Sequence, residues 1–194
     1  MSNLLQEYYG QKTYTTVVGE IRRVLPVTEV EDGVYIASNA SVILGDVEFI
    51  IYTGKLVAER IREYSVDVIV TPEAKSLALA YEVAKNLGHS KYVVARKSVK
   101  SYMKNPLIER VRSITTKEEQ ILVLCEEEVK YVKDRRVCIL DDVVSTGGTM
   151  KALERLVKKA GGNIVCRAAI WLEGPWMENE EIIYLSTLPI FRKK

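Results

Sequence analysis

Short apolar runs alternate with segments of helical periodicity over most of the chain. Runs rich in Val and Ile without alternating polar positions predict strands that are buried on both faces. The predicted core strands are Val66–Thr71, Tyr92–Ala95, Gln120–Cys125, Val137–Leu140 and Ile164–Leu172.

Helical spacing of apolar residues is clearest in three segments. From Asp46 to about Tyr64, apolar positions recur at near-helical intervals, with a possible interruption at Gly54. Ser76–Leu87 has the same character and ends before a glycine, which is typical of a helix C-terminus. Met150–Ala160 is followed by two glycines, so we expect a third helix there.

This alternation predicts an α/β fold, with an open, mainly parallel sheet of about five strands flanked by helices. The length suits one domain over residues 1–194, with a core of about 41–171 and smaller segments of about 1–40 and 172–194 outside it. A last strand-like run, Ile182–Leu185, lies in the C-terminal segment.

The N-terminal segment contains two strand-like pieces, Thr13–Val18 and Val34–Ala37, separated by Arg22, Arg23 and Pro26. It has no helical periodicity. These pieces form either a flap beside a site or an edge that covers the sheet, and the pattern favours neither.

Composition and charge exclude several classes of function. With 47% hydrophobic residues, 28% charged residues and a net charge of +2, the chain gives no overall reason to expect nucleic acid or a membrane as a partner. No apolar run approaches the ~20 residues of a membrane span, and Met1–Lys12 lacks a signal-peptide core, so we expect a cytoplasmic protein. The single histidine, His89, and three cysteines without metal-ligand spacing argue against a histidine triad or a zinc site.

The stretch Val137–Thr149 carries the clearest chemistry. A buried strand is followed by two acids, Asp141 and Asp142, and then by a run of hydroxyl groups and glycines that opens onto a helix. Carboxylates at the carboxyl end of such a strand can accept hydrogen bonds from sugar hydroxyls, and the loop can turn N–H groups and hydroxyls toward an anion. Turn formation and helix capping would explain the loop alone. Two adjacent carboxylates, however, repel each other and do not contribute to core packing. The stretch therefore predicts a site for a phosphorylated sugar.

This stretch resembles the motif that binds phosphoribosyl pyrophosphate in the type I phosphoribosyltransferases, and every position fits. The resemblance implies that Asp141 and Asp142 hold the ribose hydroxyls and take part in catalysis. It also implies a hood, formed by the segments outside the core, that closes over the base. The predicted contacts to the 5′-phosphate and its surroundings are Val144, Ser145, Thr146, Gly147, Gly148 and Thr149.

A second anion site is predicted between Thr71 and the helix that begins near Ser76. A Lys75 charge and free N–H groups at a helix N-terminus suit pyrophosphate, although Lys75 alone could be an ordinary solvated lysine. The family has its pyrophosphate loop here, which implies contacts from Glu73, Ala74, Lys75 and Ser76. Ser76 stands where the family often has glycine.

Cations follow the predicted strand Tyr92–Ala95 at its carboxyl end, where they could meet a leaving diphosphate. A charge run can also be a solvated surface. The resemblance implies that Arg96, Lys97, Lys100 and Tyr102 contact the substrate, and that Lys100 is catalytic. Residues 98–119 lack a clear period and are either a mobile lid, as in the family, or an uninvolved loop.

Two departures from the family's 6-oxopurine enzymes indicate which base the chain uses as its substrate. Ser145 stands where those enzymes usually have an acid, and Glu173 stands where hypoxanthine-guanine enzymes place a lysine. A carboxylate can accept a hydrogen bond from a 6-amino group but repels an oxo group, although Glu173 could also be a surface residue in a turn. The predicted base-binding residues are Val143, Glu173, Trp171 and Trp176, with Tyr184 and Phe191 as further candidates for stacking.

The expected activity is transfer of ribose 5-phosphate to adenine, giving AMP and pyrophosphate. Mg²⁺ is expected to bind through the substrate's hydroxyls and phosphates without direct protein ligands, and the family implies a homodimer. The alternatives are a hypoxanthine, guanine or xanthine transferase, or a non-catalytic regulator that senses phosphoribosyl pyrophosphate. The sequence has no helix-turn-helix segment before the core and no single strongly basic face, so nucleic acid is not expected.

Overall fold

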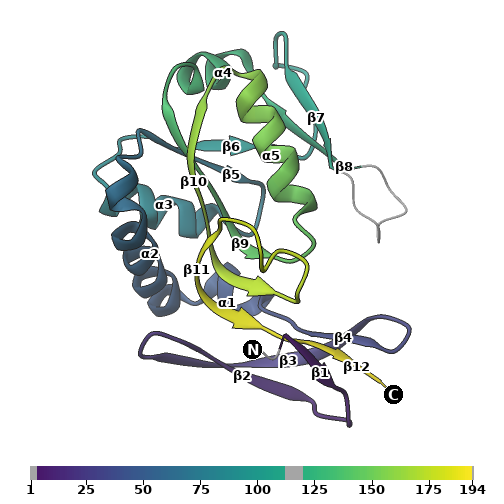
Figure 1. Ribbon diagram of the computed structural model, residues 1–194. Coiled ribbons are helices and arrows are strands. Elements are labelled where there is room, and N and C mark those ends of the chain that lie inside the picture. Colours follow the sequence, from purple (N-terminus) through teal and green to yellow (C-terminus); the bar gives the residue numbers. More distant parts are fainter. Residues whose placement is uncertain (1–3, 112–119, 194) are drawn as a thin grey trace.

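The computed structural model describes residues 4–111 and 120–193. Its central sheet has five parallel strands in the order β11-β10-β9-β5-β6, which confirms the predicted fold class (Figure 1). The strands are β5 (Val68–Pro72), β6 (Val93–Ala95), β9 (Arg136–Val144), β10 (Asn163–Glu173) and β11 (Ile183–Leu188).

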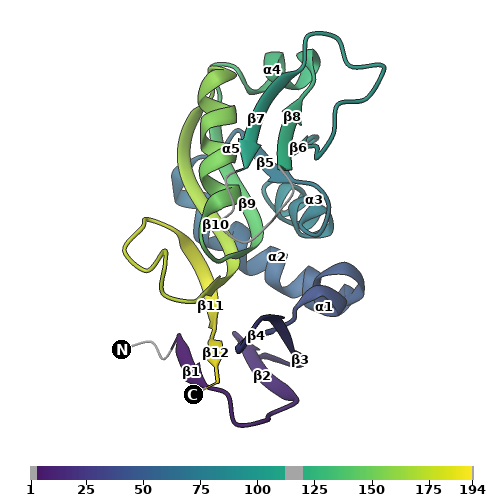
Figure 2. The ribbon, with the colours of Figure 1, turned by 90° about the vertical axis from the view of Figure 1, so that its right-hand side faces the viewer.

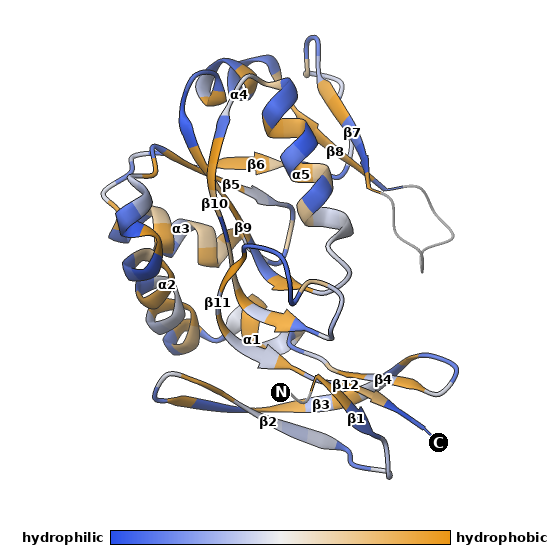
Figure 3. Ribbon diagram, viewed as in Figure 1, coloured by the Kyte–Doolittle hydropathy of each residue, from blue (hydrophilic) through white to orange (hydrophobic). Residues whose placement is uncertain are grey.

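Helices cover both faces of this sheet (Figures 1 and 2). The helices α2 (Val47–Ile61) and α3 (Leu77–Asn86) lie on one face and α5 (Gly148–Lys159) lies on the other. Successive residues of β9 point to opposite faces, so Cys138 packs with α2 and α3 whereas Ile139 packs with α5. This two-sided burial explains the continuous apolar runs, which Figure 3 shows as hydrophobic strands between amphipathic helices.

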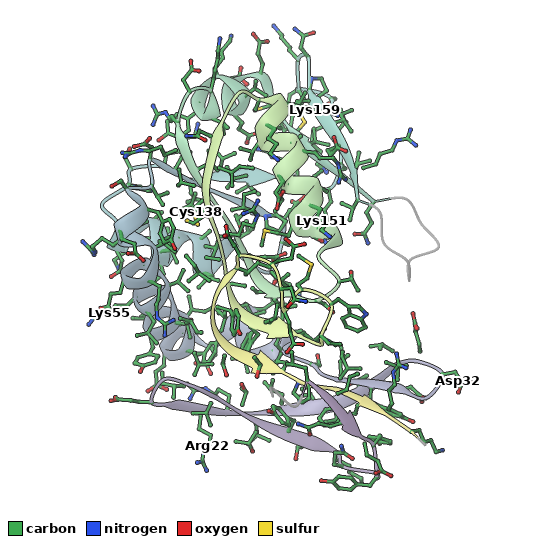
Figure 4. All side chains as sticks on the ribbon, in the orientation of Figure 1. Arg22, Asp32, Lys55, Cys138, Lys151 and Lys159 are labelled. Carbon is green, nitrogen blue, oxygen red and sulfur yellow. The ribbon has the colours of Figure 1, made fainter. Side chains whose placement is uncertain are left out.

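The exposed side of α5 is basic. Lys151 and Lys159 are exposed on this helix, while Cys138 lies inside the molecule (Figure 4).

The helix α2 runs through Gly54 without the interruption that the sequence suggested. A Cβ atom at Gly54 would lie 2.7 Å from the Glu82 side chain, so this glycine permits the close packing of α2 against α3.

A second sheet of five strands forms the hood, in the order β1-β12-β4-β3-β2. Its strands are β1 (Leu5–Glu7), β2 (Thr13–Val18), β3 (Ile21–Glu31), β4 (Val34–Ala37) and β12 (Ile190–Arg192). The strand β3 includes Arg22, Arg23 and Pro26, which we expected to separate two strands; Pro26 instead pairs in register with Thr13. Buried residues of the hood and of the central sheet belong to one hydrophobic cluster, so the hood packs directly on the central sheet.

One strand of the predicted core is placed elsewhere. The run at Gln120 does form a strand, β8 (Gln120–Leu124), but β8 pairs antiparallel with β7 (Leu107–Val111) in a separate two-stranded sheet. The fifth core strand is β11, from the segment that we placed outside the core. An apolar run predicts a strand but does not specify its partner.

The remaining elements are short. They are α1 (Ala40–Gly45), the 3-10 turn η1 (Arg62–Tyr64) and α4 (Glu126–Val132). The predicted lid at 98–119 contains β7, and its part at 112–119 lies outside the described residues. Within 4–111 and 120–193, no helix has the length and apolar character to span a membrane.

Candidate active site

The two acids of the motif lie at the carboxyl end of β9, and both are buried, with 8% of Asp141 and 3% of Asp142 exposed. Asp141 Oδ1 accepts hydrogen bonds from Ser76 Oγ at 2.7 Å and from the Asp142 N–H at 2.9 Å. Asp142 Oδ2 accepts from Lys75 Nζ and from Asn39 Nδ2, each at 2.9 Å, and its Oδ1 lies 3.2 Å from Ser76 Oγ. The acids are therefore held by residues from two other segments, the loop before α3 and the start of α1.

The environment separates the pKa values of the two carboxyl groups. Burial and the neighbouring Asp142 charge raise the pKa of Asp141 to about 8. Burial acts on Asp142 in the same direction, but the Lys75 charge and the hydrogen bonds that it accepts outweigh burial and lower its pKa. Near pH 7 the pair therefore offers one ionised acceptor and one protonated group that can donate or accept.

The loop segment Ser145–Thr149 runs from the end of β9 into the first turn of α5 and turns at Gly147, whose φ is +78°. The positive φ of Gly147 favours glycine, and a Cβ atom there would lie 2.4 Å from Met177 Sδ, so a side chain would also have to displace the flexible end of Met177. The buried Met177 belongs to the segment between β10 and β11. The free N–H groups at the start of α5 follow the loop, which suits an anion.

The loop Glu73–Ser76 joins β5 to α3, and the Glu73–Ala74 peptide bond is cis. The Glu73 carboxylate accepts a hydrogen bond from the Lys97 N–H at 3.0 Å, which ties this loop to the segment after β6. Both loops open onto one cavity of about 260 Å³. The predicted site residues that line it are Glu73, Ala74, Lys75, Ser76, Lys97, Asp141, Asp142, Val143, Val144, Ser145, Thr146, Gly147, Gly148 and Thr149.

Three predicted cationic and aromatic contacts lie outside this cavity lining. The Arg96 guanidinium donates to the Tyr102 hydroxyl, lies 5.6 Å from the centre of the Tyr102 ring and is 4.0 Å from Glu128. Lys100 is exposed to solvent on the same segment. From this cationic run, Lys97 alone is among the cavity-lining residues.

The predicted base-binding residues separate into different environments. Val143 lines the cavity, and Glu173 is buried at the end of β10. Burial raises the pKa of Glu173, while a hydrogen bond with Ser145 and the Lys75 charge act in the opposite direction. Trp176 is 47% exposed.

Trp171 is a core residue in this structure. Its side chain has no exposed surface, its ring stacks on Phe49 at 5.3 Å, and its Nε1 donates to Thr16 at 3.0 Å. Phe191 is also buried, against Tyr14. Trp171 and Phe191 are therefore core residues and present no exposed ring to a base.

The structure adds residues to the site that the sequence reasoning missed. Asn39 holds Asp142 from the start of α1, and Met177 lies against Gly147 in the loop after β9. The hairpin of β7 and β8 supplies Val111 and Ile121 to the cavity wall. An asparagine before a short helix is typical of a helix cap, so nothing in the sequence pointed from Asn39 to an acid 103 residues away.

Comparison with known proteins identifies the family. The model of the phosphoribosyl transferase domain matches residues 44–182, which is more than half of the chain. The chain belongs to the type I phosphoribosyltransferase family. This phosphoribosyltransferase is 34% identical to the adenine phosphoribosyltransferase of Fervidobacterium nodosum over 139 residues, covering 72% of this chain and 76% of that protein. It is 28% identical to the orotate phosphoribosyltransferase of Caldanaerobacter subterraneus over 108 residues, covering 56% of this chain and 45% of that protein.

Solved structures agree on the fold of this phosphoribosyltransferase. The adenine phosphoribosyltransferase of Thermoanaerobacter pseudethanolicus aligns with a TM-score of 0.63 at 24% identity, covering 73% of this chain and 82% of that chain. The Rhodothermus marinus enzyme of the same name aligns with a TM-score of 0.60 at 21% identity, covering 91% of this chain and 94% of that chain.

Proposed function

We propose that this phosphoribosyltransferase transfers ribose 5-phosphate from phosphoribosyl pyrophosphate to adenine, giving AMP and pyrophosphate. One observation carries the proposal: a buried acid pair and two anion-binding loops open onto a single cavity in a chain of this family. A sugar that carries a phosphate at one end and a diphosphate at the other needs these three subsites together.

Each subsite has a distinct task in this proposal. Asp141 and Asp142 bind the ribose hydroxyls, one as an ionised acceptor and the other able to donate, and the loop Ser145–Thr149 binds the 5′-phosphate. The loop Glu73–Ser76 binds the diphosphate, whose negative charge grows as it leaves. We assign further contacts to the leaving group to Lys97, which lines the cavity, and to Arg96, Lys100 and Tyr102 on the same segment.

The site is compatible with Mg²⁺ that binds through the oxygen atoms of the substrate. The residues in 4–111 and 120–193 contain no group of three or more His, Cys, Asp or Glu side chains arranged to hold a metal ion. The sugar hydroxyls and the diphosphate are oxygen donors of the kind that Mg²⁺ prefers, so the substrate itself would hold the ion. A bound Mg²⁺ would neutralise charge on the diphosphate.

Adenine is the proposed base because of Ser145 and Glu173. The hydroxyl of Ser145 cannot replace the carboxylate of 6-oxopurine enzymes as a proton acceptor near pH 7. Glu173 reaches Ser145 from the neighbouring strand, and an ionised Glu173 can accept a hydrogen bond from a 6-amino group. Val143 and Trp176 complete the proposed base subsite. The names of the relatives support adenine, although one of them acts on orotate.

A panel of bases tests this proposal. Purified protein is incubated with phosphoribosyl pyrophosphate, Mg²⁺ and adenine, hypoxanthine, guanine, xanthine or orotate, and nucleotide and pyrophosphate are quantified. We expect AMP to form with the highest kcat/KM. A higher kcat/KM with another base would contradict adenine as the substrate, and binding of phosphoribosyl pyrophosphate without turnover of any base would favour the sensor.

We also propose a homodimer. Large apolar side chains are exposed together at the N-terminal end of α2 and on α1 and α3, where they surround one hollow: Leu44, Val47, Ile51 and Tyr81. Exposed apolar patches of this kind mark protein interfaces. Sedimentation equilibrium should give twice the chain mass, and the mass of a single chain at micromolar concentration would contradict this proposal.

A further inference from the structure

Asn39 stands where the hood meets the core, between the end of β4 and the start of α1. Its main-chain oxygen accepts hydrogen bonds from the N–H groups of Val42 and Ile43, at 3.1 and 3.0 Å, as at a helix start. Asparagine is favoured at such positions because its side chain can accept an N–H bond from the first turn. Here the side chain makes no cap bond and turns away from its own helix.

The Asn39 side chain instead bridges an ion pair in the cavity. Its Nδ2 donates to Asp142 Oδ2 at 2.9 Å, and its Oδ1 lies 3.5 Å from Lys75 Nζ, which itself lies 2.9 Å from Asp142 Oδ2. The opposite orientation of the amide would place an oxygen against the carboxylate and N–H groups against the ammonium. Both ends of the amide are therefore matched to their partners, and only 7% of Asn39 is exposed.

The two donors to Asp142 differ in how freely they can leave it. Lys75 is exposed over 44% of its side chain and sits on the proposed diphosphate loop, so an incoming diphosphate competes for its charge. Asn39 is buried, neutral and anchored to α1 by its main chain, so it can keep donating when Lys75 turns to the substrate.

We propose that Asn39 is a positioning residue that orients Asp142 to receive the ribose hydroxyls of phosphoribosyl pyrophosphate. This inference rests on the proposed function. It makes the junction between the hood and the core part of the sugar subsite.

Two variants and one control test the inference. Asn39→Leu keeps the branching and the number of side-chain heavy atoms and removes both hydrogen bonds, and Asn39→Asp keeps the shape but places a second carboxylate beside Asp142. The control is Asn86→Leu, because Asn86 Nδ2 also donates to a carboxylate, Glu82 Oε1 at 3.0 Å, but lies at the far end of α3. Calorimetric titration gives the Kd for phosphoribosyl pyrophosphate, steady-state kinetics give KM and kcat, and thermal unfolding reports folding.

We expect Asn39→Leu to raise Kd and KM for phosphoribosyl pyrophosphate by about tenfold or more, with a smaller change in kcat and in KM for adenine. Asn39→Asp should bind more weakly than wild type near pH 8 and recover toward wild type near pH 6. Burial and the adjacent Asp142 raise the pKa of the new carboxyl group, and its protonated form can donate again. Taking the ratio of variant to wild-type Kd at each pH largely removes the titration of Asp141, Asp142 and Lys75, which both proteins share.

The outcomes separate the two claims. If the wild type binds no phosphoribosyl pyrophosphate, the proposed function fails. If the wild type binds it and both Asn39 variants bind within about twofold of wild type, the inference about Asn39 is overturned. Equal losses in Asn86→Leu would overturn it as well. If Asn39→Leu does not fold, the isosteric Asn39→Asp still tests the inference. The test is then the pH dependence of the ratio of its Kd to the wild-type Kd.

Discussion

The acid pair should make the protein less stable than a neutral variant, because one of its carboxyl groups is buried at a cost. In Asp141→Asn the amide oxygen can keep the bonds from Ser76 Oγ and from the Asp142 N–H, while the second buried acid is removed. We therefore expect this variant to unfold at a higher temperature than wild type near pH 7.5 and to bind phosphoribosyl pyrophosphate more weakly. Such a trade between stability and activity is common at functional sites.

The magnitude follows from the pKa of Asp141. The ordinary pKa of 3.8 rises to about 8 in the folded state, and each pH unit between the two values costs about 1.4 kcal/mol, or about 4 kcal/mol at pH 7. Local relaxation and the linked ionisation of Asp142 reduce this figure, so we expect a measured gain of about 1–3 kcal/mol.

The sign of the pH dependence is fixed by the raised pKa. Between about pH 4 and pH 8 the unfolded chain has lost the Asp141 proton while the folded chain keeps it, so wild-type stability falls as pH rises. The advantage of Asp141→Asn should therefore be absent near pH 4 and grow toward pH 8. Urea unfolding at a series of pH values measures it, and an advantage that does not change with pH would refute the reasoning.

Asp67 provides a control of opposite sign. Its hydrogen bonds with Arg136 lower its pKa to about 2, so it stabilises the fold above its ordinary pKa and loses that effect as pH falls. Asp67→Asn should lower the stability near pH 7, and the difference from wild type should vanish in acid. If both aspartate variants changed stability in the same direction with pH, a general effect of charge would be the cause.

Three further predictions concern the loops and the base. Lys75→Met should weaken binding of phosphoribosyl pyrophosphate by about tenfold or more, measured by calorimetry, because it removes a cation from the diphosphate loop and the partner of Asp142; an unchanged Kd would contradict this role. Gly147→Ala should lower the free energy of unfolding by about 1–3 kcal/mol, and adding Met177→Ala should partly restore it. If Gly147→Ala were as stable as wild type, the loop would accommodate a side chain at this position. Glu173→Lys should lower the ratio of adenine to hypoxanthine turnover, with Glu173→Gln intermediate; an unchanged ratio in both would remove Glu173 from base selection.

The sequence predicted the central part of the molecule well because local patterns determine it. The run Val137–Thr149 combines a two-sided buried strand, two acids and a glycine-containing turn, and the structure places all three at one edge of the sheet. The strand near Val68 and the helix after Ser76 follow from the same kinds of pattern. The parallel arrangement then brings the two loops together, as the topology requires.

The missed features depend on contacts between distant residues. The strand at Gln120 has the apolar pattern of a core strand, yet its antiparallel partner is β7 in a segment without clear periodicity. Trp171 was an attractive candidate for stacking on a base, but the sequence does not reveal the buried position between Phe49 and Thr16. Asn39 is separated from Asp142 by 103 residues, so their contact follows only from the assembled fold.

The acid pair is central to the proposed function, and calorimetric titration of phosphoribosyl pyrophosphate with Mg²⁺ tests it most directly. The comparison is between the wild type and the double variant Asp141→Asn, Asp142→Asn. Two neutral amides keep the shape of the subsite but remove the ionised acceptor for the ribose hydroxyls. We predict binding to the wild type and a loss of at least about a hundredfold in affinity for the double variant. Equal affinity in the two proteins would contradict the assignment of this cavity as the substrate site.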